Sequence, residues 1–100
     1  MYNYKIIYFI IILNFISLQA ADVSGTIDGE TWTAENSPYN VVGNITVLDL
    51  IIEPGVEVLF NGNFSFFVNG TLNATGSQVD SIFFKPAAGN SIGWQGIVFN

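Results

Sequence analysis

The sequence lacks cysteine, histidine and arginine, and its only cationic side chains are Lys5 and Lys85. Without cysteine the chain forms no disulfide and offers no thiol nucleophile. Without cysteine or histidine it cannot build the common zinc sites, and a catalytic triad that needs histidine is excluded as well. Because no basic patch can form, we expect no nucleic-acid partner.

Charge is also scarce. Charged residues make up only 10% of the 100 residues, whereas hydrophobic residues make up 50%. A soluble globular domain usually has about 25% charged residues, and a disordered chain is far less apolar than this one. The formal net charge is −6. We therefore expect at most one domain, rich in sheet and solvated mainly by asparagine, threonine, serine and glycine.

Residues 1–20 have the three parts of a secretory signal peptide. Lys5 supplies a positive charge, residues 6–18 form an apolar run, and small residues follow at Ala20 and Ala21. The run is shorter than the roughly 20 residues that a spanning helix needs, which favours a cleaved signal over a membrane anchor or a buried helix. We expect a signal-peptide helix, cleavage after Ala20, and a secreted, extracellular or cell-surface protein without a stable membrane span after cleavage.

From residue 23 onward, apolar and polar residues alternate, and no helical period appears. Alternation interrupted by glycine, asparagine and proline is typical of short strands. Glu53-Pro54-Gly55 suits a type II turn. The predicted class is all-β, with strands near residues 23–27, 31–33, 41–42, 45–47, 50–52, 56–60, 64–68, 71–74, 81–85 and 96–99.

An apparent repeat of 16 residues suggests how these strands are ordered. The spacing separates Leu50, Phe66 and Ile82. It also relates Ile52, Val68 and Phe84, Val56 and Leu72, and Val58 and Ala74. Inward residues that recur at one spacing predict a solenoid of stacked parallel coils. The alternative is a sandwich, with antiparallel hairpins closed at Asn61-Gly62 and Asn69-Gly70.

The predicted solenoid assigns each side chain to one side of its strand. The residues expected to be buried are Leu50, Ile52, Val56, Val58, Phe60, Phe66, Val68, Leu72, Ile82, Phe84 and Phe99, with Trp32 at the cap and Trp94 at a corner. Glu57 and Lys85 are expected to point outward. Phe67 and Phe83 are also outward and 16 residues apart, which predicts a small exposed aromatic pair.

The runs that suggest a known family are NITVLDLIIEPGVEVLF, FFVNGTLNATG and WQGIVF. They resemble the opening coils of secreted bacterial right-handed parallel β-helix proteins with the pectin lyase-like fold, and VSGTIDGETWTAENSPY resembles the capping segment. The resemblance implies an all-β chain, the N-terminal portion of a right-handed parallel β-helix. Its expected parts are a signal peptide at residues 1–20, a capping segment at residues 21–44 and the first coils, probably truncated, at residues 45–100.

No residue is predicted to be catalytic, to bind a cofactor or to hold a metal. Glu53 and Glu57 are the nearest pair of carboxylates for glycoside hydrolysis, but they flank a turn and Glu57 faces solvent. Lys85 is expected to be an ordinary solvated lysine. The sequons that begin at Asn44, Asn63, Asn69 and Asn73 are interpreted as products of an asparagine- and threonine-rich turn composition.

Two functions remain open from the sequence. The first is an exported, adhesin-like β-helix scaffold that contacts an extracellular polysaccharide or a cell-surface glycan, with no catalysis in this segment. The alternative is the N-terminal part of a polysaccharide lyase or glycoside hydrolase whose active site lies on later coils. The sequence does not predict the oligomeric state.

Overall fold

The computed structural model describes residues 21–100, and this part of the chain consists of β-strands and one short 3-10 turn. In chain order the elements are β1 (Ala21–Trp32), η2 (Ala34–Asn36), β2 (Tyr39–Ile52), β3 (Glu57–Phe60), β4 (Phe66–Ala74), β5 (Phe83–Pro86) and β6 (Ile97–Phe99). The predicted all-β class is confirmed for these residues. The predicted signal peptide at residues 1–20 lies outside the described residues. Within residues 21–100, no helix has the length and apolar character needed to cross a membrane.

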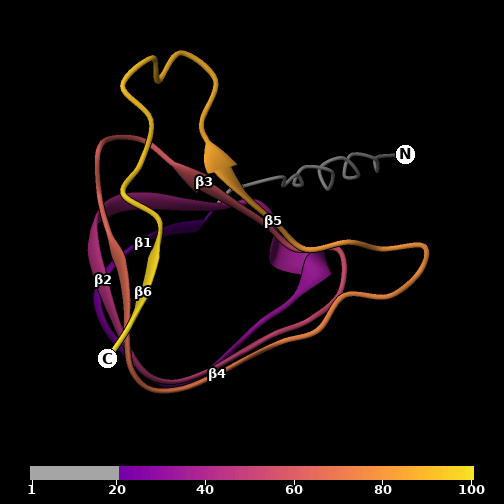
Figure 1. Cartoon of the computed structure of the whole chain (residues 1–100). Helices are drawn as coiled ribbons and strands as arrows, with labels where there is room; N and C mark the ends of the chain where they lie inside the picture. The colour runs from indigo at the N-terminus through magenta and orange to yellow at the C-terminus, as the bar shows by residue number, and fades with distance from the viewer. Residues whose placement is uncertain (1–20) are drawn as a thin grey trace, which may run out of the picture.

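The strands of residues 21–100 form one six-stranded sheet, in which every pair is parallel and which curls around the interior (Figure 1). The long strand β2 is central: β1 pairs along it, β3 pairs with its first residues, and β4 pairs with its later ones. β5 then pairs with β3, and β6 pairs with β4. The chain therefore passes each side of the molecule repeatedly, adding a strand each time. The expected boundary between residues 44 and 45 falls inside β2.

The parallel pairing shows that the hairpins considered as an alternative do not form in the described residues. Asn61-Gly62 lies in the loop between β3 and β4, which pair with different parts of β2 rather than with each other. Asn69-Gly70 lies inside β4. Parallel strands need a connection that crosses over, and no two-residue turn can supply it.

The 16-residue repeat is wrong as a description of the register. Leu50 lies opposite Leu72, whereas Phe66 lies opposite Ile45 on one side and Ile97 on the other. The true spacings are longer than 16 and unequal. Inward side chains recur every second residue along a strand, so any even spacing aligns inward residues with one another. The 16-residue match recorded this alternation and not the stacking of strands.

The spacings are unequal because the loops lengthen from one pass to the next. At one corner of the sheet, the connecting residues are 42–44, then 61–65, then 87–96. At another corner they are 33–38, then 53–56, then 75–82. The last loop at each corner extends outward from the curled sheet (Figure 1). The turn predicted at residues 53–55 is confirmed by the positive φ of 89° at Gly55.

The core consists of apolar side chains from the inner face of the curled sheet. Its buried members in the described residues are Ile27, Trp32, Tyr39, Val41, Ile45, Val47, Leu50, Ile52, Val56, Val58, Phe60, Phe66 and Val68. Leu72, Ile82, Phe84 and Trp94, which the sequence also assigned to the core, are only half-buried against it. Phe99 is 69% exposed, so its predicted burial is wrong. The half-buried residues and Phe99 lie at or near the last strands, where no further strand of the described chain covers them.

Aromatic rings form a continuous chain of contacts through this core. Trp32 stacks on Tyr39 with their centroids 4.6 Å apart, and it meets the edge of Phe66 at 6.2 Å. Phe66 also makes edge contacts with Phe60 at 6.4 Å and Phe84 at 5.4 Å. Edge-to-face and offset-stacked arrangements are the favoured geometries for aromatic pairs. Phe66 therefore links the rings of earlier and later strands.

Gly70 lies at a bulge where two residues of β4 face one residue of β2. Val47 lies opposite Val68 and Asp49 lies opposite Thr71, so Asn69 and Gly70 together face Leu48. A Cβ atom at Gly70 would overlap the Leu48 carbonyl group. Glycine in a strand often marks such a close approach of two backbones. The Asn-Gly pair is therefore explained by the bulge rather than by a turn.

Candidate functional site

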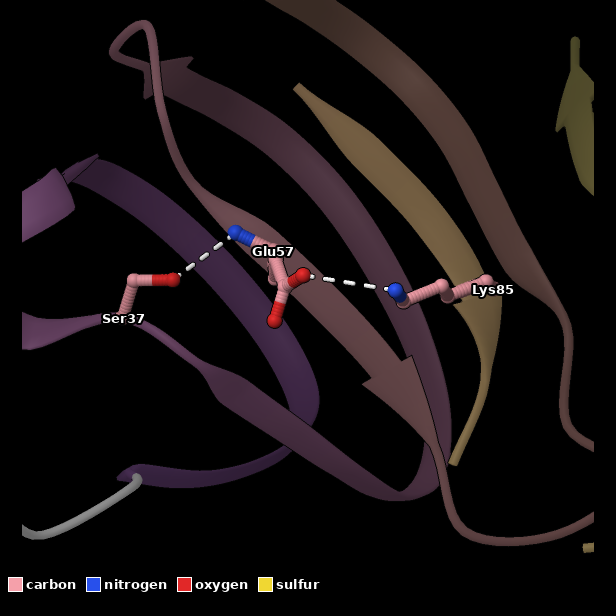
Figure 2. Close-up of polar contacts among 3 residues, drawn as sticks. All are labelled: Ser37, Glu57 and Lys85. Atoms are coloured by element: carbon pink, nitrogen blue, oxygen red, sulfur yellow. Dashed lines mark hydrogen bonds and ion pairs between the residues drawn. The ribbon is translucent and has the colours of Figure 1, made fainter. Parts of the chain in front are cut away.

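Polar groups from three successive passes of the chain meet on the outer surface near β3 (Figure 2). The backbone N–H of Glu57 donates a hydrogen bond to Oγ of Ser37 at 2.8 Å. On its other side, the Glu57 carboxylate accepts an ion pair from Nζ of Lys85 at 3.3 Å. The Lys85 and Glu57 side chains are 51% and 40% exposed. The outward orientation predicted for both residues is confirmed.

Strand register explains why this ion pair forms. Glu57 lies directly opposite Phe83, and Lys85 follows two residues later on the same face of β5. Diagonal neighbours on adjacent strands are within reach of long side chains. The sequence gave both residues the correct side of the strand, but the pairing itself could not be found because the assumed spacing was wrong.

Phe83 is the aromatic ring of this surface. It is 51% exposed, and Nζ of Lys85 lies 5.5 Å from its ring centroid. The predicted pair of Phe67 and Phe83 does not match the register, because Phe67 lies in β4 opposite Thr46 and Val98. Phe83 therefore belongs to the surface around Glu57 and Lys85, and Phe67 belongs to a different side of the sheet.

An open depression of about 410 Å³ lies beside Phe83 and Glu57, and we refer to it as the Phe83 groove. The loop of residues 75–82 contributes Val79, Asp80 and Ser81, and the other lining residues are Ala34, Ser37, Pro38 and Gly55. The loop is held locally, since the backbone N–H of Asp80 donates to Oγ of Ser77 at 3.0 Å and the N–H of Ser77 donates to the Asp80 carbonyl at 2.9 Å. The groove thus combines an aromatic ring, carboxylates and hydroxyl groups.

A second open depression, of about 370 Å³, lies between the corner at Asn61 and the loop around Asn90. The side-chain amide of Asn90 donates to the carbonyls of Phe60 at 2.8 Å and Gly93 at 3.0 Å. Its oxygen accepts from the N–H groups of Ile92 at 3.0 Å and Gly93 at 3.2 Å. Asn90 therefore fixes this loop to the end of β3, and its polar atoms are already engaged.

The carboxylates considered for hydrolysis occupy different surroundings. Glu57 is paired with Lys85. Glu53 is exposed, and its backbone N–H donates to the Trp32 carbonyl at 2.9 Å where the turn begins. Within residues 21–100, no group of three acidic residues is close enough to hold a metal ion.

The four sequon asparagines are all exposed. Oδ1 of Asn44 accepts from the N–H of Ser65 at 3.0 Å, which joins two successive corners. Nδ2 of Asn100 donates to Oδ1 of Asn69 at 2.7 Å across β4 and the end of β6. These bonds support the interpretation that asparagine is abundant here because it satisfies polar groups between successive strands.

Comparison of this chain with protein-family models, with curated proteins and with solved structures found no match. The functional argument therefore rests on the geometry of the chain itself.

Proposed function

We propose that this chain is part of an exported right-handed parallel β-helix that serves as an adhesin-like extracellular or cell-surface scaffold. Its partner is an extracellular polysaccharide or a cell-surface glycan, and the segment itself is not catalytic. The observation that carries the proposal is the stacking of equivalent residues over four strand levels. Ala21, Tyr39, Val58 and Phe84 form one such column, and Gly25, Ile45, Phe66 and Ile97 form another.

The physics of parallel strands supports this reading. A strand that returns parallel to itself in the same sheet does so by a right-handed connection in nearly all known cases. Successive turns then bury a continuous core, while loops of variable length are tolerated at the corners. The lengthening loops at residues 61–65 and 87–96 fit such a scaffold, because they change the outer surface without disturbing the strands.

Engineered disulfides provide a direct test of the scaffold, since the chain contains no cysteine of its own. Thr46 and Phe67 are register partners, so the double variant Thr46→Cys with Phe67→Cys should oxidise to a disulfide. Adjacent strands are about 4.8 Å apart, which lies within the range that a disulfide spans. The matched control is Ile51→Cys with Phe67→Cys, whose sites are 16 residues apart and should not cross-link. Cross-linking of the control pair alone would contradict the proposed stacking.

The exported, non-catalytic role needs separate measurements. N-terminal sequencing of protein recovered from the medium or the cell surface should begin at Ala21 or Asp22. The exported chain should release no new reducing ends or unsaturated products from acidic or neutral polysaccharides, with calcium present. Reproducible cleavage by a homogeneous preparation would replace the scaffold with an enzyme, and a chain that keeps Met1 in the membrane would contradict export.

A further inference from the structure

We propose that the Phe83 groove binds a neutral hexose unit of a glycan. This inference rests on the glycan-contacting role proposed above and deepens it by naming the site and the class of sugar. The groove is open to solvent, and its volume of about 410 Å³ lies within the roughly 300–1,000 Å³ of small-molecule sites. Residues from successive passes of the chain form its walls, so its shape depends on the strand register.

Phe83 provides the apolar surface that a sugar ring requires. Its ring is 51% exposed, and Val79 on the facing loop is 87% exposed, although both side chains are apolar. One face of a pyranose consists of C–H groups with partial positive charge, and the face of an aromatic ring is negative. Stacking a sugar on Phe83 therefore removes apolar surface from water on both partners.

The Glu57–Lys85 pair provides a hydrogen-bond acceptor and a donor side by side. The ion pair joins Nζ of Lys85 to Oε2 of Glu57, and both side chains remain substantially exposed. A carboxylate accepts through both oxygens and an ammonium group has three donors, so each retains capacity for a ligand. Adjacent hydroxyl groups on a hexose each donate and accept, and they match this arrangement without requiring charge.

The local charge selects against acidic sugars. Glu57 and Asp80 both line the groove, and Lys85 is the only cationic side chain in residues 21–100. Because Lys85 is already paired with Glu57, a uronate would meet an uncompensated carboxylate at Asp80. Like charges at close range are unfavourable, and the overall net charge of −6 adds to the repulsion. A neutral hexose avoids this penalty.

The depression at Asn90 is a weaker candidate for the same ligand. Its lining residues are Asn61, Gly62, Ala88, Gly89, Asn90, Ser91 and Ile92, which include no aromatic ring. The amide of Asn90 is also occupied by its bonds to Phe60, Ile92 and Gly93. Stacking and hydrogen bonding therefore coincide at Phe83 and not at Asn90.

The test is an NMR titration of the exported chain with short oligosaccharides. The neutral probes are oligomers of mannose, glucose and galactose, and the charged probes are oligogalacturonate and oligoglucosamine. We expect at least one neutral probe to shift the amide signals of Glu57, Phe83 and Lys85, with oligogalacturonate binding more weakly. Phe83→Ala should weaken this binding roughly tenfold through loss of stacking, whereas Phe83→Tyr should retain it.

Phe67→Ala is the matched control, because it removes the same side chain from a strand outside the groove and should leave sugar binding unchanged. Lys85→Met should weaken binding about threefold by removing a donor. Preserved amide shifts of Phe60 and Trp94 in each variant show that the core is intact. Equal binding by Phe83→Ala and the native chain, or tighter binding of oligogalacturonate or oligoglucosamine, would overturn the proposal.

The outcomes separate this site from the scaffold on which it rests. If the Thr46–Phe67 disulfide forms but no neutral sugar binds, the groove proposal fails and the scaffold remains. If a sugar binds but shifts only residues far from Phe83, the glycan-contacting role remains and the site is wrong. If the disulfide does not form in the predicted register, the scaffold and the groove both fail.

Discussion

Phe66→Ala should cause a large loss of stability. Phe66 has no exposed surface, and its ring meets the edges of Trp32, Phe60 and Phe84 at 6.2, 6.4 and 5.4 Å. Replacing a buried phenylalanine by alanine costs about 3–5 kcal/mol, because the transfer energy is lost and a cavity remains. Natural domains are stable by only about 5–15 kcal/mol. The substitution should therefore remove a large part of the free energy of unfolding.

The control for this prediction is the next residue, Phe67, whose side chain is half-exposed on the outer face. Full burial of such a side chain contributes about 1.5–3 kcal/mol, so Phe67→Ala should cost about 1 kcal/mol. Urea unfolding followed by the fluorescence of Trp32 and Trp94 measures both values. For a domain of this size, each kcal/mol shifts the melting temperature by roughly 4–8 °C. Equal losses in the two variants would show that β4 does not place Phe66 inside the sheet.

Three further substitutions test individual features. Gly70→Ala should cost about 1–3 kcal/mol, because its Cβ would overlap the Leu48 carbonyl; Thr71→Ala, at an exposed neighbouring position, should have little effect in the same urea titration. Asn90→Ala should destabilise the loop of residues 87–96 by about 1–3 kcal/mol and speed amide hydrogen exchange at Ile92 and Gly93, whereas Asn90→Asp, which keeps the acceptor, should speed it less. Lys85→Met should change stability by less than about 1 kcal/mol, with the difference shrinking in high salt, because the Glu57–Lys85 pair is substantially exposed; a larger, salt-independent loss would contradict this view of the pair.

Local pattern was enough to predict the class of fold and most of its inner face. Alternation identified Leu50, Ile52 and Val58 as inward residues, and these are buried. The side of a strand residue depends only on its own strand, which is why this part of the prediction was correct. The same local rule placed Glu57 and Lys85 on the outer face.

Register could not be predicted, because it depends on which strand lies beside which. The loops lengthen from residues 42–44 to 61–65 and 87–96, and nothing in an alternating pattern fixes the length of a loop. An error in register then moves every predicted contact between strands. For this reason Phe67 was paired with Phe83, and the contact of Glu57 with Lys85 was missed. The interpretation of Asn69-Gly70 failed similarly, since a bulge and a hairpin turn both favour glycine.

The division between constant strands and variable loops also explains where a function can develop. The strands need apolar residues at fixed inward positions, so substitution there affects stability first. The loops of residues 33–38 and 75–82 carry no buried side chain, yet together with β3 and β5 they form the Phe83 groove. Their side chains can change without loss of the core, while the parallel register still holds them beside Glu57 and Phe83. Binding specificity is therefore set by the loops, and its geometry is set by the stacking of the strands.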